Sequence, residues 1–131
     1  MIVGIGVDVV EIARARRLLR AYGDRLLARV CTVDEAAYVR SHVDGAQHLA
    51  VRLAAKEAAF KALAGSLAAR GIGWREIEVV AADGGPPGLV FHERARIRAL
   101  ELQAGRPFLS LSHSDSTAVA VVVIEAMPSQ H

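Results

Sequence analysis

The chain has 131 residues, of which 53% are hydrophobic and 23% charged, which fits one compact domain and leaves little room for a second. Its formal net charge of +2 gives no indication of a general nucleic-acid surface. The single cysteine, Cys31, excludes an internal disulfide, fits a reducing compartment and is best explained as a small buried hydrophobe.

The N-terminal residues 1–8 are apolar, but they lack a positively charged start and are too short to span a membrane. We therefore expect a cytoplasmic protein with neither a signal peptide nor a membrane anchor. Residues 2–10 mix β-branched side chains with Gly4 and Gly6, which predicts a buried strand whose glycines admit close approach of backbone or ligand.

Asp8 lies near the end of this expected strand and has two possible roles. It can be the N-cap of the following helix, with Glu11 completing a capping box. Alternatively, it can hold a hard cation such as Mg²⁺ if a second carboxylate is supplied from elsewhere in the chain. Glu57 is the candidate for that second carboxylate.

Apolar residues recur at helical spacing over residues 11–30 and leave Arg14, Arg17 and Arg25 on the opposite side. Gly23 interrupts the pattern, so two short helices fit as well as one long helix. The arginines form either an ordinary solvated face or a docking surface for an acidic helical partner, since complementary charge raises encounter rates and fixes orientation.

Residues 52–63 contain strong helix formers without glycine or proline, which predicts the central helix of the fold. Glu57 and Lys61 are four residues apart and share one helix face, either as a solvated ion pair or as a polar pair held in a cleft. Small alanines around them predict burial on more than one side. Lys56 points about a quarter turn away, which favours a structural part. Earlier in the chain, Thr32 and Glu35 have the spacing of a capping box.

The C-terminal half predicts two hairpins separated by a helix over residues 93–103. The first hairpin joins residues 77–81 to residues 89–91 through the turn Asp83–Gly88. The second joins residues 108–112 to residues 118–124. We therefore expect an α+β domain in which a largely antiparallel sheet of about four or five short strands packs against the long alanine-rich helix.

His113 lies at the end of a predicted strand, beside a turn rich in serine. An isolated histidine is most often structural, but the flanking Ser112 and Ser114 favour binding of an anion.

Three motifs now stand in order along the chain: Gly4–Ile12, Leu53–Ala58 with Lys61–Leu63, and Ser110–His113. Together they resemble the signatures of holo-acyl-carrier-protein synthase, the small type of 4'-phosphopantetheinyl transferase. The resemblance covers residues 1–125 as one domain and leaves 126–131 as a C-terminal tail.

This resemblance implies transfer of 4'-phosphopantetheine from coenzyme A to a serine of an apo acyl carrier protein, as in fatty-acid or polyketide biosynthesis. It implies that Asp8 and Glu57 hold Mg²⁺. Phosphoryl-type transfer needs charge neutralisation and an aligned nucleophile, so Lys61 would meet the phosphate being transferred. Asp8, Glu57 and Lys61 are therefore the expected catalytic residues.

The resemblance also assigns binding residues and partners. His113 would bind a phosphate of coenzyme A, while Gly65 and Ser66 replace the glycine-rich turn that the family places near the nucleotide. Arg14 would contact the carrier protein, with Arg17 and Arg25 on the same basic segment. The family further implies a homotrimer with active sites between subunits.

Two functions from other classes fit the same residues. A basic helix on a small domain suits a non-enzymatic adaptor for carrier proteins or nucleic acid. A carboxylate pair with a lysine suits another Mg²⁺-dependent nucleotide hydrolase. The adaptor would function without Asp8 or Glu57, whereas the hydrolase would turn over a nucleotide without any protein acceptor.

Overall fold

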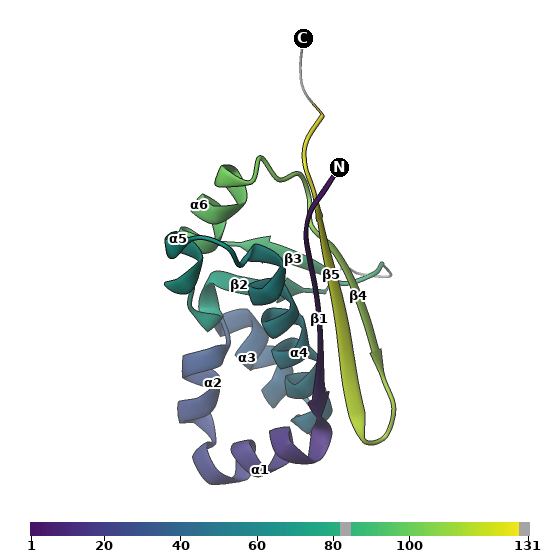
Figure 1. The fold of residues 1–131 in the computed structure, drawn as a ribbon. Coiled ribbons are helices and arrows are strands. Elements are labelled where there is room, and N and C mark those ends of the chain that lie inside the picture. The colour runs from purple at the N-terminus through teal and green to yellow at the C-terminus, as the bar shows by residue number, and fades with distance from the viewer. Residues whose placement is uncertain (82–84, 129–131) are drawn as a thin grey trace.

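The computed structural model describes residues 1–81 and 85–128. Within them, helices and antiparallel strands form an α+β fold, as the sequence predicts (Figure 1). In chain order the elements are β1 (Ile2–Glu11), α1 (Ile12–Tyr22), α2 (Asp24–Val30), α3 (Val33–Arg40), α4 (Ala46–Leu63), α5 (Leu67–Arg70), the 3-10 helix η1 (Trp74–Glu76), β2 (Ile77–Val80), β3 (Gly88–Phe91), α6 (Glu93–Glu101), β4 (Phe108–His113) and β5 (Thr117–Glu125).

The strands are all antiparallel, but they do not form the single sheet that we expected. They divide into a three-stranded sheet in the order β1-β5-β4 and a separate pair, β2-β3. Helix α4 packs along β1 and β5, and the β2-β3 pair contacts α4 through β2 and β4 through β3 (Figure 1). The alanine-rich helix is therefore the centre of the fold.

Both predicted hairpins are present, β2-β3 and β4-β5. The described residues leave out 82–84 and 129–131. The first two residues of the predicted turn Asp83–Gly88 and the end of the predicted tail therefore lie outside them. The tail begins in contact with the fold, because Ala126 bridges Ala104 and its amide donates to the carbonyl oxygen of Met1. No helix among the described residues combines the length and the apolar character needed to cross a membrane.

Helix α4 and strand β1 approach each other so closely that the strand has no room for side chains at two positions. A Cβ atom at Gly4 would overlap the carbonyl oxygen of Ala62, and one at Gly6 would overlap that of Ala58. The predicted close approach of backbone at these glycines is confirmed. On the helix, Ala54 and four further alanines are fully or almost fully buried: Ala55, Ala58, Ala59 and Ala62.

The helix boundaries follow local signals in most places. Thr32 caps α3 in a reciprocal capping box with Glu35, as predicted. Gly23, at φ 53°, separates α1 from α2, so the interpretation as two short helices is correct. The predicted capping box of Asp8 and Glu11 is wrong, because β1 continues to Glu11, which is itself the N-cap residue and has no side-chain capping bond.

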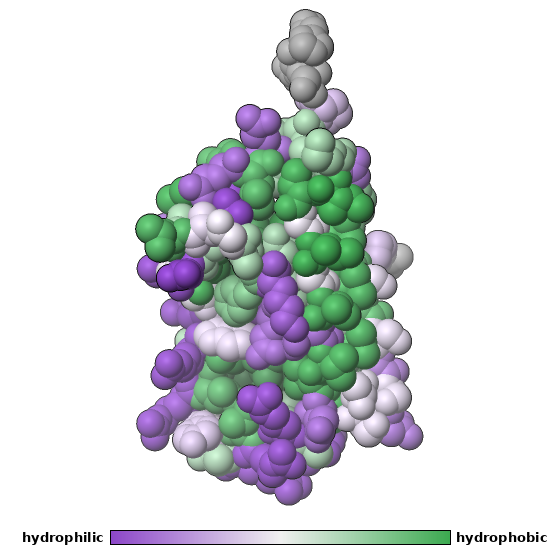
Figure 2. Space-filling view, viewed as in Figure 1, coloured by the Kyte–Doolittle hydropathy of each residue, from purple (hydrophilic) through white to green (hydrophobic). Residues whose placement is uncertain are grey.

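Beyond the side that packs on α4, the three-stranded sheet has a second face that is apolar and uncovered. Ile5, Val7 and Val9 are 64%, 53% and 57% exposed. Opposite them in the register stand Val123, Val121 and Val119 of β5, and Phe108 of β4 is also exposed. We call these seven residues the outer sheet face; Figure 2 shows hydrophobic side chains gathered along this side of the molecule.

Candidate functional site

Strand β1 and helix α4 bring three of the predicted site residues together. The Nζ atom of Lys61 lies 2.9 Å from Oδ1 of Asp8 and donates a second hydrogen bond, also of 2.9 Å, to the carbonyl oxygen of Val7. Glu57, one helical turn earlier, faces the carboxyl group of Asp8. The ion pair of Lys61 recorded among the described residues is thus with Asp8 rather than with Glu57 on its own helix.

The two carboxyl groups differ in acidity. Burial, a hydrogen bond with Asp8 and the negative charge of Asp8 raise the pKa of Glu57 to about 7, against a smaller opposing effect of Arg14 and Lys61. Burial works to raise the pKa of Asp8 as well, but its interactions with Glu57 and Lys61 outweigh burial and lower that pKa. At neutral pH Asp8 is therefore ionised, while Glu57 is close to its midpoint.

This carboxylate pair fits a hard divalent cation. Oδ2 of Asp8 is buried and, among residues 1–81 and 85–128, accepts no hydrogen bond from an amide, hydroxyl or ammonium donor, so a cation would satisfy it. Mg²⁺ is typically held by one or two carboxylates, with water and substrate phosphates completing its octahedron. In residues 1–81 and 85–128 no group of three or more His, Cys, Asp or Glu side chains is placed to hold a metal ion.

Arg14 adjoins this pair at the start of α1. It lines a small apolar cavity of about 120 Å³ together with Glu57, Val10 and neighbouring core residues, and its charge acts on Glu57. Arg25 lies on α2, where it borders a hollow of about 460 Å³ that also contains Tyr22. Arg14, Arg17 and Arg25 are all exposed, which fits either a solvated face or a docking surface, and of the three Arg14 is the one placed next to Glu57.

His113 lies far from the carboxylates within one chain. Its Nε2 atom is 3.0 Å from Nε2 of Gln47, near the start of α4. Gln47 precedes Glu57 by ten residues, which corresponds to about 15 Å along a helix. The fold therefore separates His113 from Asp8, Glu57 and Lys61.

A further hollow, of about 260 Å³, is lined by His113 and by polar residues for which we predicted no role from the sequence. Arg52 lies 4.3 Å above the ring of Tyr38, and His48 stacks on His42 with 3.7 Å between ring centroids. In the sequence, the one indication that these side chains meet is the helical periodicity of α4, which puts Arg52 on the same face as His48. The contact with His113 depends on pairing of distant strands.

Gly65 and Ser66 directly follow α4, one turn beyond Lys61. Together with Phe60 and Arg70 they line a hollow of about 600 Å³. Gly65 adopts φ 116°, a conformation that favours glycine. The Oγ atom of Ser66 accepts a hydrogen bond of 3.2 Å from the amide of Ala69 and so caps α5.

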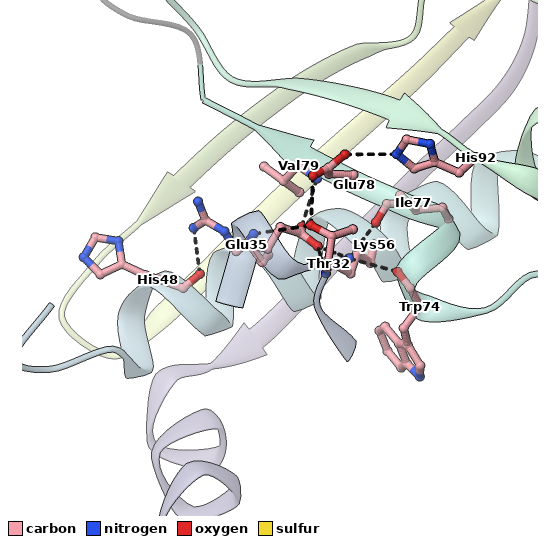
Figure 3. A network of polar contacts seen from close by, with 10 residues as sticks. Thr32, Glu35, His48, Lys56, Trp74, Ile77, Glu78, Val79 and His92 are labelled. Atoms are coloured by element: carbon pink, nitrogen blue, oxygen red, sulfur yellow. Dashed lines mark hydrogen bonds and ion pairs between the residues drawn. The ribbon is translucent and has the colours of Figure 1, made fainter. Parts of the chain in front are cut away.

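Lys56, the neighbour of Glu57 on α4, is fully buried and points toward α3 and the β2-β3 pair (Figure 3). Its Nζ atom lies 2.8 Å from Oε1 of Glu35 and 2.9 Å from the carbonyl oxygen of Trp74. Glu35 also accepts a 2.9 Å hydrogen bond from the amide of Val79. The network joins α3, α4 and the β2-β3 pair, which agrees with the structural part expected for Lys56.

Two carboxylates with an adjoining ammonium form the set of groups that phosphoryl-type transfer uses. The comparisons with known proteins agree with this class. A family model described as 4'-phosphopantetheinyl transferase superfamily matches residues 4–122. The chain belongs to this superfamily, as its three motifs predicted.

Several named relatives are similar over nearly the whole chain. The holo-[acyl-carrier-protein] synthase of Koribacter versatilis is 41% identical over 95% of this chain and 99% of the relative. That of Geobacter sulfurreducens is 42% identical, covering 95% of this chain and 98% of the relative.

Solved structures give the same relationship. The holo-[acyl-carrier-protein] synthase of Neisseria meningitidis has a TM-score of 0.83 at 31% identity and covers 95% of this chain and 99% of the solved one. The enzyme of Bacillus anthracis, solved in complex with CoA (3',5'-ADP), has a TM-score of 0.78 at 32% identity, with 97% and 99% covered.

Proposed function

We propose that this protein transfers 4'-phosphopantetheine from coenzyme A to a serine hydroxyl of an apo acyl carrier protein, releasing adenosine 3',5'-bisphosphate. The observation that carries the proposal is the meeting of Asp8, Glu57 and Lys61 at one place, in a chain similar to holo-[acyl-carrier-protein] synthases from end to end. Residues 1–125 form the transferase domain. The reaction takes place in the cytoplasm.

In the proposed mechanism the serine oxygen attacks the phosphorus next to the pantetheine, and the bond from that phosphorus to the bridging oxygen breaks. Asp8 and Glu57 would hold Mg²⁺, which supplies charge neutralisation on the pyrophosphate oxygens. Lys61 turns its ammonium group from Asp8 to the phosphate and stabilises the charge that develops on the leaving group. The serine proton passes to the carboxylate of Glu57.

The substrates bind on two sides of these residues. Coenzyme A contacts Lys61, Gly65, Ser66 and His113. It occupies the 600 Å³ hollow beside Gly65 and the 260 Å³ hollow at His113. The carrier protein docks on the exposed arginines of α1 and α2, whose charge complements an acidic helix. Those residues are Arg14, Arg17 and Arg25.

The active protein is a homotrimer whose sites lie between subunits. Two observations support this assembly. The outer sheet face is apolar and uncovered in one chain, which is typical of an interaction surface. His113 is too distant from Glu57 to act in the same site unless a neighbouring subunit supplies it.

The test is to mix the purified protein with coenzyme A, Mg²⁺ and an apo acyl carrier protein and to weigh the carrier by mass spectrometry. We expect a gain of one phosphopantetheine group, and no gain with Asp8→Ala or Glu57→Gln. Carrier binding without modification would support the adaptor instead. Turnover of coenzyme A in the absence of carrier would support the hydrolase.

A further inference from the structure

The C-terminal end of α4 is an unfavourable place for an anion. The helix has 18 residues, and the carbonyl groups of its last turn carry a partial negative charge. Lys61 lies in that last turn, and Gly65 and Ser66 follow it directly. A phosphate that meets Lys61 would therefore also approach the negative end of the helix dipole.

Arg98 of α6 contacts this helix end. Its Nε atom donates a 2.7 Å hydrogen bond to the carbonyl oxygen of Leu63, and its Nη2 atom donates one of 3.0 Å to that of Ala64. The side chain is only 11% exposed, so it is held in this position by packing. One guanidinium thus satisfies two carbonyl groups at the end of the helix and opposes their charge.

The same arginine underlies the turn that lines the 600 Å³ hollow. A Cβ atom at Gly65 would come within 3.4 Å of Nη2 of Arg98, so the guanidinium lies directly against the turn. The Nη1 atom of Arg98 is 3.5 Å from Oε1 of Glu101, and the hydroxyl of Ser66 donates to that same oxygen at 3.4 Å. Arg98 and Glu101 therefore fix the turn from α6.

We propose that Arg98 is a positioning residue for coenzyme A. It neutralises the carboxyl end of α4 and holds residues 64–66 in the conformation that receives the nucleotide. This inference rests on the proposed function, because it takes coenzyme A as the ligand of Lys61, Gly65 and Ser66.

The experiment separates coenzyme A binding from the rest of the reaction. We expect Arg98→Met to raise the KM for coenzyme A about tenfold, because it leaves the negative end of α4 uncompensated and the turn unsupported, with kcat and the KM for the carrier protein nearly unchanged. Calorimetric titration of coenzyme A without carrier should show the same loss of affinity. Arg98→Lys keeps the charge but cannot contact both carbonyl groups, so its affinity for coenzyme A should lie between that of the wild-type protein and that of Arg98→Met.

Arg96, which is exposed on the same helix, provides the matched control, and Arg96→Met should leave both measurements at the wild-type value. Thermal unfolding identifies any variant that fails to fold, and the Arg98→Lys titration then carries the test. An unchanged affinity for coenzyme A in folded Arg98 variants would overturn the inference, as would equal loss of kcat and carrier affinity. Failure of the wild-type protein to modify any carrier would instead reject the proposed function.

Discussion

Glu57 occupies a position in which its charge opposes folding. Its pKa of about 7 in the folded protein exceeds the ordinary value of 4.5 that applies when the chain is unfolded. The folded state therefore binds the proton more tightly, and the stability from this group is fully present below pH 4.5 and is lost as pH rises through 7. Asp8, whose pKa is lowered, stays ionised across the upper part of this window.

We therefore predict that Glu57→Gln unfolds at a higher temperature than the wild-type protein at pH 8, in the presence of a chelator. The advantage should shrink as pH falls to 5, because the wild-type carboxyl group then becomes neutral as well. Thermal unfolding followed by circular dichroism at the two pH values measures this difference. Glu125→Gln, at an exposed position, should show no such trend. A Glu57→Gln advantage independent of pH would contradict the explanation.

Lys56 and Lys61 belong to the same helix but differ in what they support. Lys56→Met leaves the carboxylate of Glu35 buried without its partner, and we expect a loss of about 3–5 kcal/mol in the free energy of unfolding. Lys61→Met removes an ion pair whose lysine is 57% exposed and should cost at most about 1 kcal/mol. Urea denaturation compares the two variants.

The transfer assay should rank the same two variants differently. Lys61→Met should remain folded and lose phosphopantetheine transfer, because it lacks the ammonium group that we propose meets the phosphate. Comparable stability of the two methionine variants would show that the Lys56–Glu35 pair is not a structural requirement. The sequence distinguished these lysines by helical periodicity, but it could not show that Lys61 pairs with Asp8, since that contact depends on β1 packing beside α4.

At the scale of elements, Gly4 and Gly6 of β1 set the distance between the strand and α4. Gly6→Ala would drive a Cβ atom into the carbonyl oxygen of Ala58, a backbone group that cannot move aside without shifting the helix. We expect a loss of about 1–3 kcal/mol from overpacking. Because Asp8 and Glu57 lie on these two elements, Mg²⁺-dependent transfer should fall as well.

Gly88→Ala is the matched control for this substitution. A Cβ atom at Gly88 would lie 3.7 Å from a methyl group of Val80, an ordinary contact, so stability and transfer should change little. Urea denaturation and the transfer assay measure both variants. If Gly6→Ala behaved like Gly88→Ala, the tight contact between β1 and α4 would have no part in holding the two carboxyl groups together.

Local sequence patterns predicted individual elements of this fold but not how distant strands pair. The hairpins and the Thr32 cap follow from signals within a few residues and were predicted, and the break at Gly23 was one of two alternatives that the sequence left open. The division of the strands into two sheets was not, because β1 pairs with β5 from the far end of the chain, Ile5 opposite Val123. The same long-range pairing extends β1 past Asp8 and removes the predicted helix cap.

At the scale of the whole molecule, the outer sheet face determines whether the proposed assembly forms. Val7 points outward at its centre, 53% exposed. We predict that Val7→Glu yields a folded monomer, because burying a carboxylate in an apolar interface is costly. Light scattering during size-exclusion chromatography measures the mass. A trimer with Val7→Glu, or a wild-type monomer, would contradict the role of this face.

Mixed assemblies can decide which subunits form one site. Glu57→Gln and His113→Ala should each impair transfer when assayed alone. If one subunit supplies Glu57 and its neighbour supplies His113, unfolding and refolding the two variants together at equal amounts restores an intact pair at about one quarter of the interfaces of a cyclic trimer. Phosphopantetheine transfer should then rise above that of either variant alone.

The same mixture gives no rise if both residues act within one chain, because every chain carries one of the two substitutions. A control mixture in which both variants also carry Val7→Glu should show no rise under either arrangement, since those chains do not associate. Transfer that recovers only when the outer sheet face is intact would therefore link three features of the molecule. In that arrangement the sheet would join the subunits, and the neighbouring chain would close the distance that α4 sets between Gln47, next to His113, and Glu57.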